Sequence, residues 1–340
     1  MPRAHPRTKG RSNGSNHLGP RLRIANVNMT SRSSTLYSAS NPVDPATYGY
    51  SRVVVPTALG DVVVNAAPCS AAPSPTATVL LHGAAGSWTT WLPLIRAAHN
   101  TGEPLQNVIA LDLPGWGDSG NLPRGTTVED MVDVVAHIAR KLGFVDWHVI
   151  GHSLGGHLAL TLAARYPERT LSVNAISTTG PGALAVLRNP VRNFRTLPLL
   201  AGMLGAMRFL AAIGPAGGAL IRVLHRARLF GPLSSPLFAQ WRELDASVID
   251  SLASEIRPHA FVHAAEAAAR YDEREWSSIH CPVTLVRGER DAFVSADDDV
   301  WFAETLPQAR QHSTVRAGHF AHVERAGLDA PLPAAVPVGV

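Results

Sequence analysis

The chain has 340 residues, enough for one large domain or for a domain with an insertion. Hydrophobic residues make up 46% of it and charged residues 16%, which indicates a folded protein and excludes a wholly disordered one. The net charge of +4 arises from seven Lys and Arg residues that precede Asp44, and the rest of the chain carries three more acids than bases. This slightly acidic body argues against nucleic acid as the partner of the core.

The number and spacing of cysteine and histidine residues argue against a disulfide-stabilised protein and against a metal-binding one. Cys69 and Cys281 are too few for a disulfide framework. Metal-ligand spacings such as C-x-x-C and H-E-x-x-H do not occur in the sequence. We therefore expect a protein that works without a metal or another cofactor.

Residues 1–45 predict a disordered basic tail, because they are rich in Arg, Ser, Asn and Gly and lack hydrophobic periodicity. The tail has no apolar run of signal-peptide length. Its acid-poor composition also fits a transit peptide, and translation from Met29 is a third interpretation; the sequence leaves these open. We expect a cytoplasmic protein, with peripheral membrane association as the alternative.

Strand and helix patterns then alternate along the chain. Two β-rich runs flank a Gly60-Asp61 turn and predict a hairpin. Further apolar runs predict buried strands, and amphipathic runs between them predict helices. Such alternation is typical of an α/β fold with a mostly parallel sheet covered on both faces. The strands are expected near 51–55, 61–65, 78–81, 107–111, 147–150, 171–176, 282–286 and 311–315, and the helices near 88–99, 128–142, 158–164 and 296–306.

The alternation stops between about residues 181 and 278, where the composition is helical and punctuated by proline. We interpret this segment as a helical cap inserted into a core formed by residues 46–180 and 279–330. It has no acid between Gly180 and Arg242 but many arginines. Residues 196–221 are apolar enough to consider a membrane span, but Arg208 in the middle would cost roughly 3 kcal/mol. A weak contact between the cap and a membrane surface is the more plausible alternative.

The centre of the pattern is GHSLGG at residues 151–156, which follows a strand pattern and precedes a helix pattern. This is a G-x-S-x-G turn in its strand–turn–helix context. A sharp turn there presents Ser153 away from the backbone, and it needs neighbours almost free of side chains, such as Gly151 and Gly155. The arrangement predicts a nucleophilic serine at the positive end of a helix.

A nucleophilic serine needs a base, and the base needs an acid that orients it. Asp291 follows the end of one predicted strand and His319 the end of the next, where groups of an open parallel sheet gather. The order Ser153, Asp291, His319 is the order that such folds use. Rival histidines and acids stay open at this point: His82, His148, His152 and His322, and Asp297, Asp298 and Asp299.

The oxyanion of such a reaction must be met by backbone N–H donors. One is expected from Leu154, directly after the nucleophile, and the other from the loop after the strand at 78–81, at Ala84. The small residues of this loop allow the backbone to approach a substrate. The candidates for the substrate pocket are His82, Gly83, Trp116 and His152, with Trp116 expected to shape the loop beside the pocket.

Five ordered motifs resemble those of the α/β-hydrolase superfamily: HGAAG at 82–86, DLPGWGDS at 112–119, GHSLGG at 151–156, GERD at 288–291 and GH at 318–319. The resemblance implies Ser153 as nucleophile, Asp291 as acid, His319 as base, and Ala84 and Leu154 as oxyanion donors. It also implies a lid at residues 181–278, as in capped esterases and carbon–carbon bond hydrolases. A serine in the turn argues against the epoxide hydrolase and haloalkane dehalogenase relatives, which use aspartate there.

These patterns predict a cofactor-free serine hydrolase that cleaves small or medium, largely apolar carboxylic esters through an acyl-enzyme. The same three residues could serve carbon–carbon bond hydrolysis, lactone opening or perhydrolysis, and a non-catalytic binding protein on this fold is the second alternative. The sequence indicates neither the oligomeric state nor the substrate.

Overall fold

The computed structural model describes Met1 and residues 44–67 and 76–326. The predicted tail at 1–45 therefore lies outside the described residues, apart from Met1 and its last two positions. Asp44 accepts a hydrogen bond from the N–H of Ala46 and so caps the first element, the 3-10 helix η1 (Pro45–Tyr48). Cys69 and the residues after 326 also lie outside.

Within the described residues, the strands form one eight-stranded sheet in the order β1-β2-β4-β3-β5-β6-β7-β8. The pairs β1/β2 and β2/β4 are antiparallel and all others are parallel, so the expected mostly parallel sheet is confirmed. The strands are β1 (Ser51–Thr57), β2 (Gly60–Ala66), β3 (Thr76–Leu81), β4 (Val108–Leu111), β5 (Asp146–His152), β6 (Thr170–Ile176), β7 (Val283–Gly288) and β8 (Arg310–Thr314).

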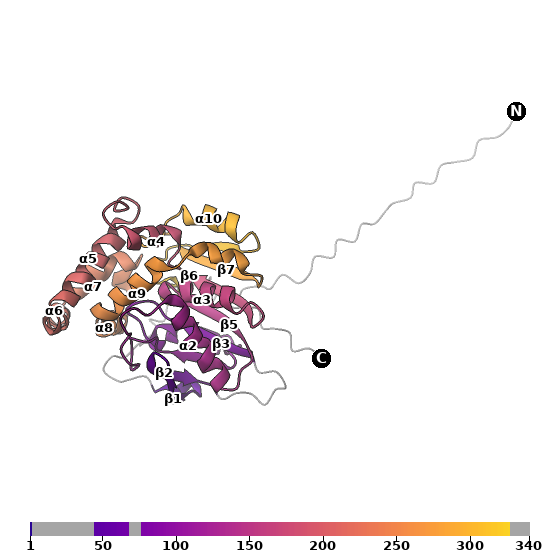
Figure 1. Ribbon diagram of the computed structural model, residues 1–340, viewed down its shortest axis with the longest axis horizontal. Helices are drawn as coiled ribbons and strands as arrows, with labels where there is room; N and C mark the ends of the chain where they lie inside the picture. The colour runs from indigo at the N-terminus through magenta and orange to yellow at the C-terminus, as the bar shows by residue number, and fades with distance from the viewer. Residues whose placement is uncertain (2–43, 68–75, 327–340) are drawn as a thin grey trace. The chain divides into compact units, whose positions relative to one another are not determined.

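Helices cover both faces of this sheet (Figure 1). Alternate residues of one strand belong to two different apolar clusters: Val79 and Leu81 pack with one face and Leu80 with the other. The first cluster contains α2 (Val128–Lys141) and α3 (Leu154–Arg165), and the second contains η2 (Trp88–Trp91), α1 (Leu92–Asn100) and α11 (Ala321–Glu324). The expected helix at 88–99 thus begins as a separate 3-10 turn, with Pro93 in the first turn of α1. The helix α10 (Asp298–Thr305) precedes β8.

The start of α2 follows the pattern in its sequence. The Thr127 hydroxyl accepts a hydrogen bond from the N–H of Asp130, and the Asp130 carboxylate accepts one from the N–H of Thr127. This reciprocal box satisfies two N–H groups that would otherwise lack partners. At the other end, Gly143 adopts φ 90°, a left-handed conformation that ends the helix.

Only helices and connecting turns lie between β6 and β7 in the described chain, and we refer to residues 181–278 as the helical insertion. Proline occupies the first turn of α4, α5, α6 and α9, where its missing N–H costs no hydrogen bond. Residues of α9 belong to the same apolar cluster as the sheet, so the insertion shares a core with it. Its elements are α4 (Pro181–Arg188), α5 (Pro198–Ala212), α6 (Pro215–Arg226), α7 (Phe230–Ser234), η3 (Ser235–Leu237), η4 (Trp241–Glu243), α8 (Ala246–Glu255), α9 (Pro258–Arg270) and η5 (Glu273–Ser278).

The apolar run at 196–221 is divided between α5 and α6 by a turn at Gly214, which has φ 57°. Among the described residues, we find no helix whose length and hydropathy would allow it to cross a membrane.

The turn between β5 and α3 brings three stretches of backbone into close approach. Ser153 has φ 52° and ψ −115°, an uncommon conformation for a residue with a side chain. A Cβ atom on Gly151 would lie 2.1 Å from the carbonyl oxygen of Gly155. A Cβ atom on Gly155 would lie 1.9 Å from the carbonyl oxygen of Leu81 in β3. These two glycines therefore fix α3 against β3 and β5.

We predict that Gly155→Ala lowers the free energy of unfolding by about 3 kcal/mol or more, because backbone atoms of β3 must move to admit the methyl group. The matched control is Gly205→Ala in α5, where a Cβ atom would have no neighbour within 4 Å. It should raise stability by about 0.5–1 kcal/mol through helix propensity. Urea unfolding of both variants measures this, and equal effects would contradict the steric account.

Candidate active site

Three side chains from distant parts of the sequence form one chain of hydrogen bonds. Nε2 of His319 lies 3.0 Å from Oγ of Ser153, and Nδ1 of His319 lies 3.1 Å from each carboxylate oxygen of Asp291. Asp291 follows β7, His319 follows β8, and Ser153 follows β5. With Nδ1–H donating to the carboxylate, Nε2 of the neutral imidazole is free to accept the serine proton.

The carboxylate of Asp291 is fully buried, and its partners keep it ionised. Burial by itself raises the pKa of Asp291, but the adjacent His319 ring, through its charge and its hydrogen bond, and the N–H of Phe293 outweigh burial. The pKa of Asp291 therefore lies below its usual range. A permanent negative charge thus faces Nδ1 of His319.

The backbone around His319 is held from three directions. Its N–H donates to the carbonyl oxygen of Leu237 in the insertion at 2.9 Å, and its carbonyl oxygen accepts from Nε2–H of His152 at 2.9 Å. Glu324 accepts from the N–H of Gly318 and also from the N–H groups of Ala239 and Gln240. Glu324 therefore joins the His319 loop to the insertion, a role that no sequence motif indicated.

The two predicted oxyanion donors lie at the same place. Ala84 and Leu154 both line a small cavity with Ser153 and His319. Ala84 stands in a turn closed by the hydrogen bond from the N–H of Gly86 to the carbonyl of Gly83, with Ala85 at φ 68°. Leu154 is the first residue of α3, so its N–H belongs to the donors that a helix leaves without internal partners. Both residues border the space beside Ser153, and their role as oxyanion donors stays a prediction.

The four predicted pocket residues take different positions. His152 lines the larger cavity described below, whereas His82, Gly83 and Trp116 are absent from its lining and from that of the small cavity, within the described chain. His82 is buried beneath the Ala84 turn: its Nε2 accepts from the N–H of Leu113, and its Nδ1–H donates to the carbonyl of Gly83.

Gly83 and Trp116 also support the site from outside the cavities. A Cβ atom on Gly83 would lie 2.8 Å from Nδ1 of His152, so Gly83 allows the turn to approach that ring. Trp116 is fully buried and meets the His82 ring edge to face, with ring centroids 6.2 Å apart. As pocket candidates these three residues are thus absent from the lining of both cavities in the described chain, and their contacts stabilise the loops beside the pocket.

The rival histidines and acids have other partners. His322 is buried between the rings of Trp91 and His152, and its ring nitrogens form no hydrogen bond to any described residue, Ser153 included. Asp298 accepts from the N–H of Gly182, and Asp299 pairs with Arg287 at 2.8 Å. Of the candidates, only Asp291 and His319 join the hydrogen-bond chain of Ser153 in the described structure, whereas His152 lines the same cavity but bonds to the His319 carbonyl.

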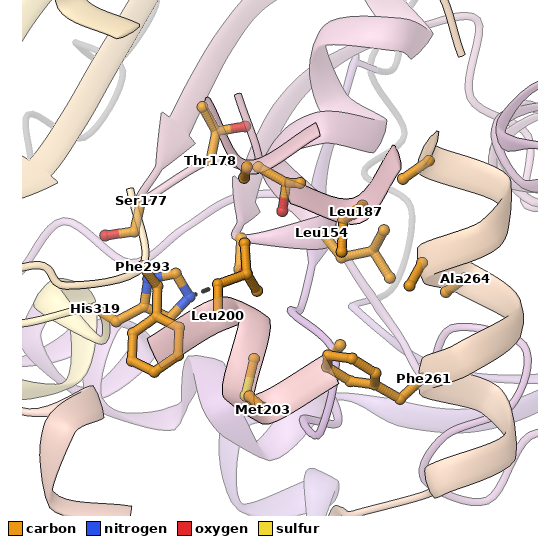
Figure 2. A pocket seen from close by; sticks show the side chains of 16 residues that line it. Leu154, Ser177, Thr178, Leu187, Leu200, Met203, Phe261, Ala264, Phe293 and His319 are labelled. Carbon is orange, nitrogen blue, oxygen red and sulfur yellow. Dashed lines mark hydrogen bonds between the residues drawn. The ribbon is translucent and has the colours of Figure 1, made fainter. Parts of the chain in front are cut away.

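Two adjoining cavities meet at Ser153. The smaller, about 60 Å³, lies between the loop after β6, α4, α5 and α9. Figure 2 shows it, with His319 and Phe293 at one end, Leu200 and Met203 of α5 below, and Phe261 and Ala264 of α9 opposite. The larger, about 440 Å³, lies among α5, α6, α7 and α8 of the insertion. Both are lined mainly by apolar side chains.

With this geometry in place, comparison with known proteins defines the class. The family model of the alpha/beta hydrolase fold matches residues 77–326. The chain therefore belongs to the α/β-hydrolase family, as its eight-stranded sheet among the described residues also indicates.

The relatives match different shares of the chain. A 2-hydroxy-6-oxononadienedioate/2-hydroxy-6-oxononatrienedioate hydrolase of Burkholderia vietnamiensis is 28% identical over 265 residues, which cover 74% of this chain and 83% of the relative. The dihydrolipoyllysine-residue acetyltransferase component of the acetoin cleaving system of Cupriavidus necator is 41% identical over 110 residues, but the match spans 31% of this chain and just 27% of that relative. The structure of a thermophilic esterase from Thermogutta terrifontis is similar in fold, with a TM-score of 0.59 at 22% identity, over 81% of this chain and 93% of the esterase.

Several buried histidines surround the site in neutral form. Burial lowers the pKa of His82 and of His157 to about 4 and that of His322 to about 3. Both ring nitrogens of His322 lack a hydrogen-bond partner among the described residues. An unfolded chain protonates such rings near pH 6.5, so between that pH and the lowered pKa the unfolded state binds more protons. Their contribution to stability therefore falls as the pH falls below about 6.5.

We predict that His322→Phe removes one such contribution. Relative to the wild type, the free energy of unfolding of the variant should rise by about 2 kcal/mol between pH 7 and pH 5. Burial raises the pKa values of Asp112 and Asp298 to about 6, so these two groups make stability rise as the pH falls. Both are present in the wild type and in the variant, and the comparison of the two proteins cancels their effect. His312→Phe on the exposed strand β8 is the control. A pH-independent difference for His322→Phe, measured by urea unfolding, would refute the prediction.

Proposed function

We propose that this protein is a serine hydrolase that cleaves carboxylic esters with a sizeable apolar group. The observation that carries the proposal is the 3.0 Å contact between Oγ of Ser153 and Nε2 of His319, at a point where two apolar cavities meet. A serine so placed has a base within proton-transfer distance. The Asp291 carboxylate holds that base in the required tautomer.

The proposed reaction has two halves. His319 takes the proton of Ser153 as Oγ attacks the ester carbonyl, and then delivers it to the leaving alkoxide, so that an acyl-enzyme and an alcohol form. A water molecule then attacks the acyl-enzyme while His319 takes its proton, and the acid leaves with Ser153 restored. In each half, the N–H groups of Ala84 and Leu154 are suited to the oxygen that becomes negative, since both residues line the cavity beside Ser153.

The shape of the site favours an unsymmetrical substrate. One group of the ester must fit the cavity of about 60 Å³, while the other can occupy the cavity of about 440 Å³. Leu210, Ile221 and Leu224 are among the apolar side chains that line the larger one. A medium-length acyl or alkyl chain would gain free energy there through burial of its CH₂ groups.

Carbon–carbon bond hydrolysis is the second candidate, because a curated relative of 28% identity is named for a dienedioate. A dicarboxylate brings two charges that need partners in an apolar cavity. Apart from His152 and His319, Arg257 is the one ionisable side chain among the described residues that line the larger cavity. Its guanidinium already lies 3.6 Å from the Glu255 carboxylate. This lining suits an uncharged ester better than a dianion.

The first prediction from this proposal concerns Ser153 and its base. The wild type should react with a fluorophosphonate probe, whereas Ser153→Ala and His319→Ala should not. Ester hydrolysis should fall by about 10⁴ to 10⁶-fold in Ser153→Ala, His319→Ala and Asp291→Asn, since the three act as a unit. Peptide mapping of the labelled wild type should find the probe on Ser153. Labelling of the Ser153→Ala variant, or a folded wild type that stays unlabelled, would contradict the assignment.

The second prediction concerns the larger cavity. Leu210→Trp narrows it and should lower kcat/KM for esters of octanoic or longer acids by roughly tenfold while sparing acetate esters. Phe209→Trp is the matched control, because Phe209 is the next residue of α5 but is 59% exposed and outside the cavity lining. Equal effects of both variants would refute the role of the cavity. Faster cleavage of a dienedioate than of any ester would favour carbon–carbon bond hydrolysis instead.

A further inference from the structure

Exposed apolar side chains gather on one part of the chain. In the described residues, large exposed hydrophobic side chains elsewhere are single and scattered, namely Val54, Val145, Leu171, Val300 and Val315 besides Met1. Nine others lie within 43 residues of the helical insertion. They are Val191, Phe194, Leu199, Phe209, Ile213, Leu220, Val223, Leu229 and Leu233. Such a concentration is uncommon on a protein surface that contacts only water.

The same segment carries exposed arginines without acidic partners. No Asp or Glu occurs between residues 181 and 242. Six of its arginines form no ion pair with any residue that the structure describes, whereas Arg188 pairs with Glu273. On the packed neighbour α8, Asp250 lies 3.4 Å from His225. The six are Arg192, Arg195, Arg208, Arg222, Arg226 and Arg228.

The exposed arginines and the exposed apolar side chains lie together in one groove of the surface. Arg192, Arg195 and Arg208 line one open groove of about 540 Å³ together with Val191 and Phe194. This groove lies between the α4–α5 connection and α5. Positive charge and exposed apolar area are therefore combined in a single groove.

The helix α6 extends the pattern. Leu220 and Val223 are exposed and three residues apart, so they lie on one face of the helix. Arg222 and Arg226 are exposed on an adjacent face, four residues apart. Figure 1 shows α5 and α6 next to each other at one side of the insertion. We refer to the exposed arginines and apolar residues of 191–233 as the arginine–apolar surface.

The larger cavity opens within this surface. Leu199 is 41% exposed and Leu233 is 63% exposed, and both line the cavity that reaches Ser153. The helix α5 separates groove and cavity: Gly205 and Arg208 line the groove, and Ala206 and Leu210 line the cavity. An apolar molecule at this surface would thus have a continuous apolar route to Ser153.

We propose that the arginine–apolar surface docks on an anionic phospholipid bilayer. Unpaired arginines complement the negative headgroups, and the interleaved apolar side chains enter the boundary between headgroups and acyl chains. Docking places the cavity mouth against the bilayer, so an apolar ester can pass from lipid to the cavity. The docking itself is independent of the proposed reaction, whereas the delivery of an ester rests on it.

The test measures sedimentation of the full-length Ser153→Ala protein with vesicles, so that no lipid is hydrolysed. Vesicles of phosphatidylcholine alone should bind weakly, and those with roughly one third phosphatidylglycerol should bind well, with binding that weakens at high salt. Arg195→Glu/Arg208→Glu/Arg222→Glu should bind the anionic vesicles about 100-fold more weakly, since each arginine near such a surface contributes roughly fivefold.

A charge-matched control distinguishes a defined surface from net charge. Arg124→Glu/Lys141→Glu/Arg310→Glu changes the charge equally at exposed positions outside the insertion. It should weaken vesicle binding by less than about threefold, because long-range interactions are screened. An equal loss in both triple variants would overturn the proposal. Loss of binding on replacing the basic residues before Asp44, with no effect of the insertion variants, would overturn it too.

An apolar pair of variants tests insertion into the bilayer. Phe209→Gln should weaken binding severalfold at constant charge, and Val300→Gln, equally exposed on α10, should not. Tighter binding of the protein to an oligonucleotide than to anionic vesicles would refute a lipid partner. The fluorophosphonate reaction of the wild type in the absence of vesicles tests the proposed function separately, so the two can fail independently.

Discussion

The close approach of backbone at Ser153 is the constraint on which the rest of the site depends. Because Gly155 has no side chain, its backbone can approach the carbonyl of Leu81 so closely that a methyl group would not fit between them. The helix α3 can therefore start directly against β3 and β5. That position sets where Ser153 and Leu154, the first residue of α3, lie relative to β3 and β5. It also brings the Ala84 turn, which follows β3, to the cavity that Ser153 lines. One backbone contact thereby positions Ser153 together with Ala84 and Leu154, the two predicted oxyanion donors.

The candidate active residues were predictable because strand ends carry positional information. Parallel strands place the residues after their carboxyl ends at one edge of the sheet, so Asp291 after β7 and His319 after β8 could be expected near Ser153. Their hydrogen-bond distances agree with that expectation. The capping box at Thr127 and the proline-started helices were likewise readable, since local sequence alone decides them.

Other features could not be predicted from the sequence, because they depend on the direction in which a loop side chain points. His82 and Trp116 are close to Ser153 in the motif order, yet their rings turn beneath the loops and are buried. The alternation that assigns strand residues to faces ends where a loop begins. Glu324 gives a second example: its partners Ala239 and Gln240 are more than 80 residues away, and no spacing rule connects them. The cavity lining depends on similar long-range packing of α5 to α8.

The buried histidines around His319 also make electrostatic sense. In the proposed reaction His319 takes the serine proton and becomes an imidazolium, which nearby positive charge would destabilise. Burial and the neighbouring His322 and His319 rings hold the pKa of His152 well below its usual value, so that ring is neutral although its centroid lies 5.0 Å from that of His319. Asp291, whose pKa is lowered, then supplies the charge that faces the imidazolium. Burial of the neighbouring histidines lowers stability in acid. It also keeps them uncharged, so Asp291 is the charged group that faces His319 in the proposed reaction.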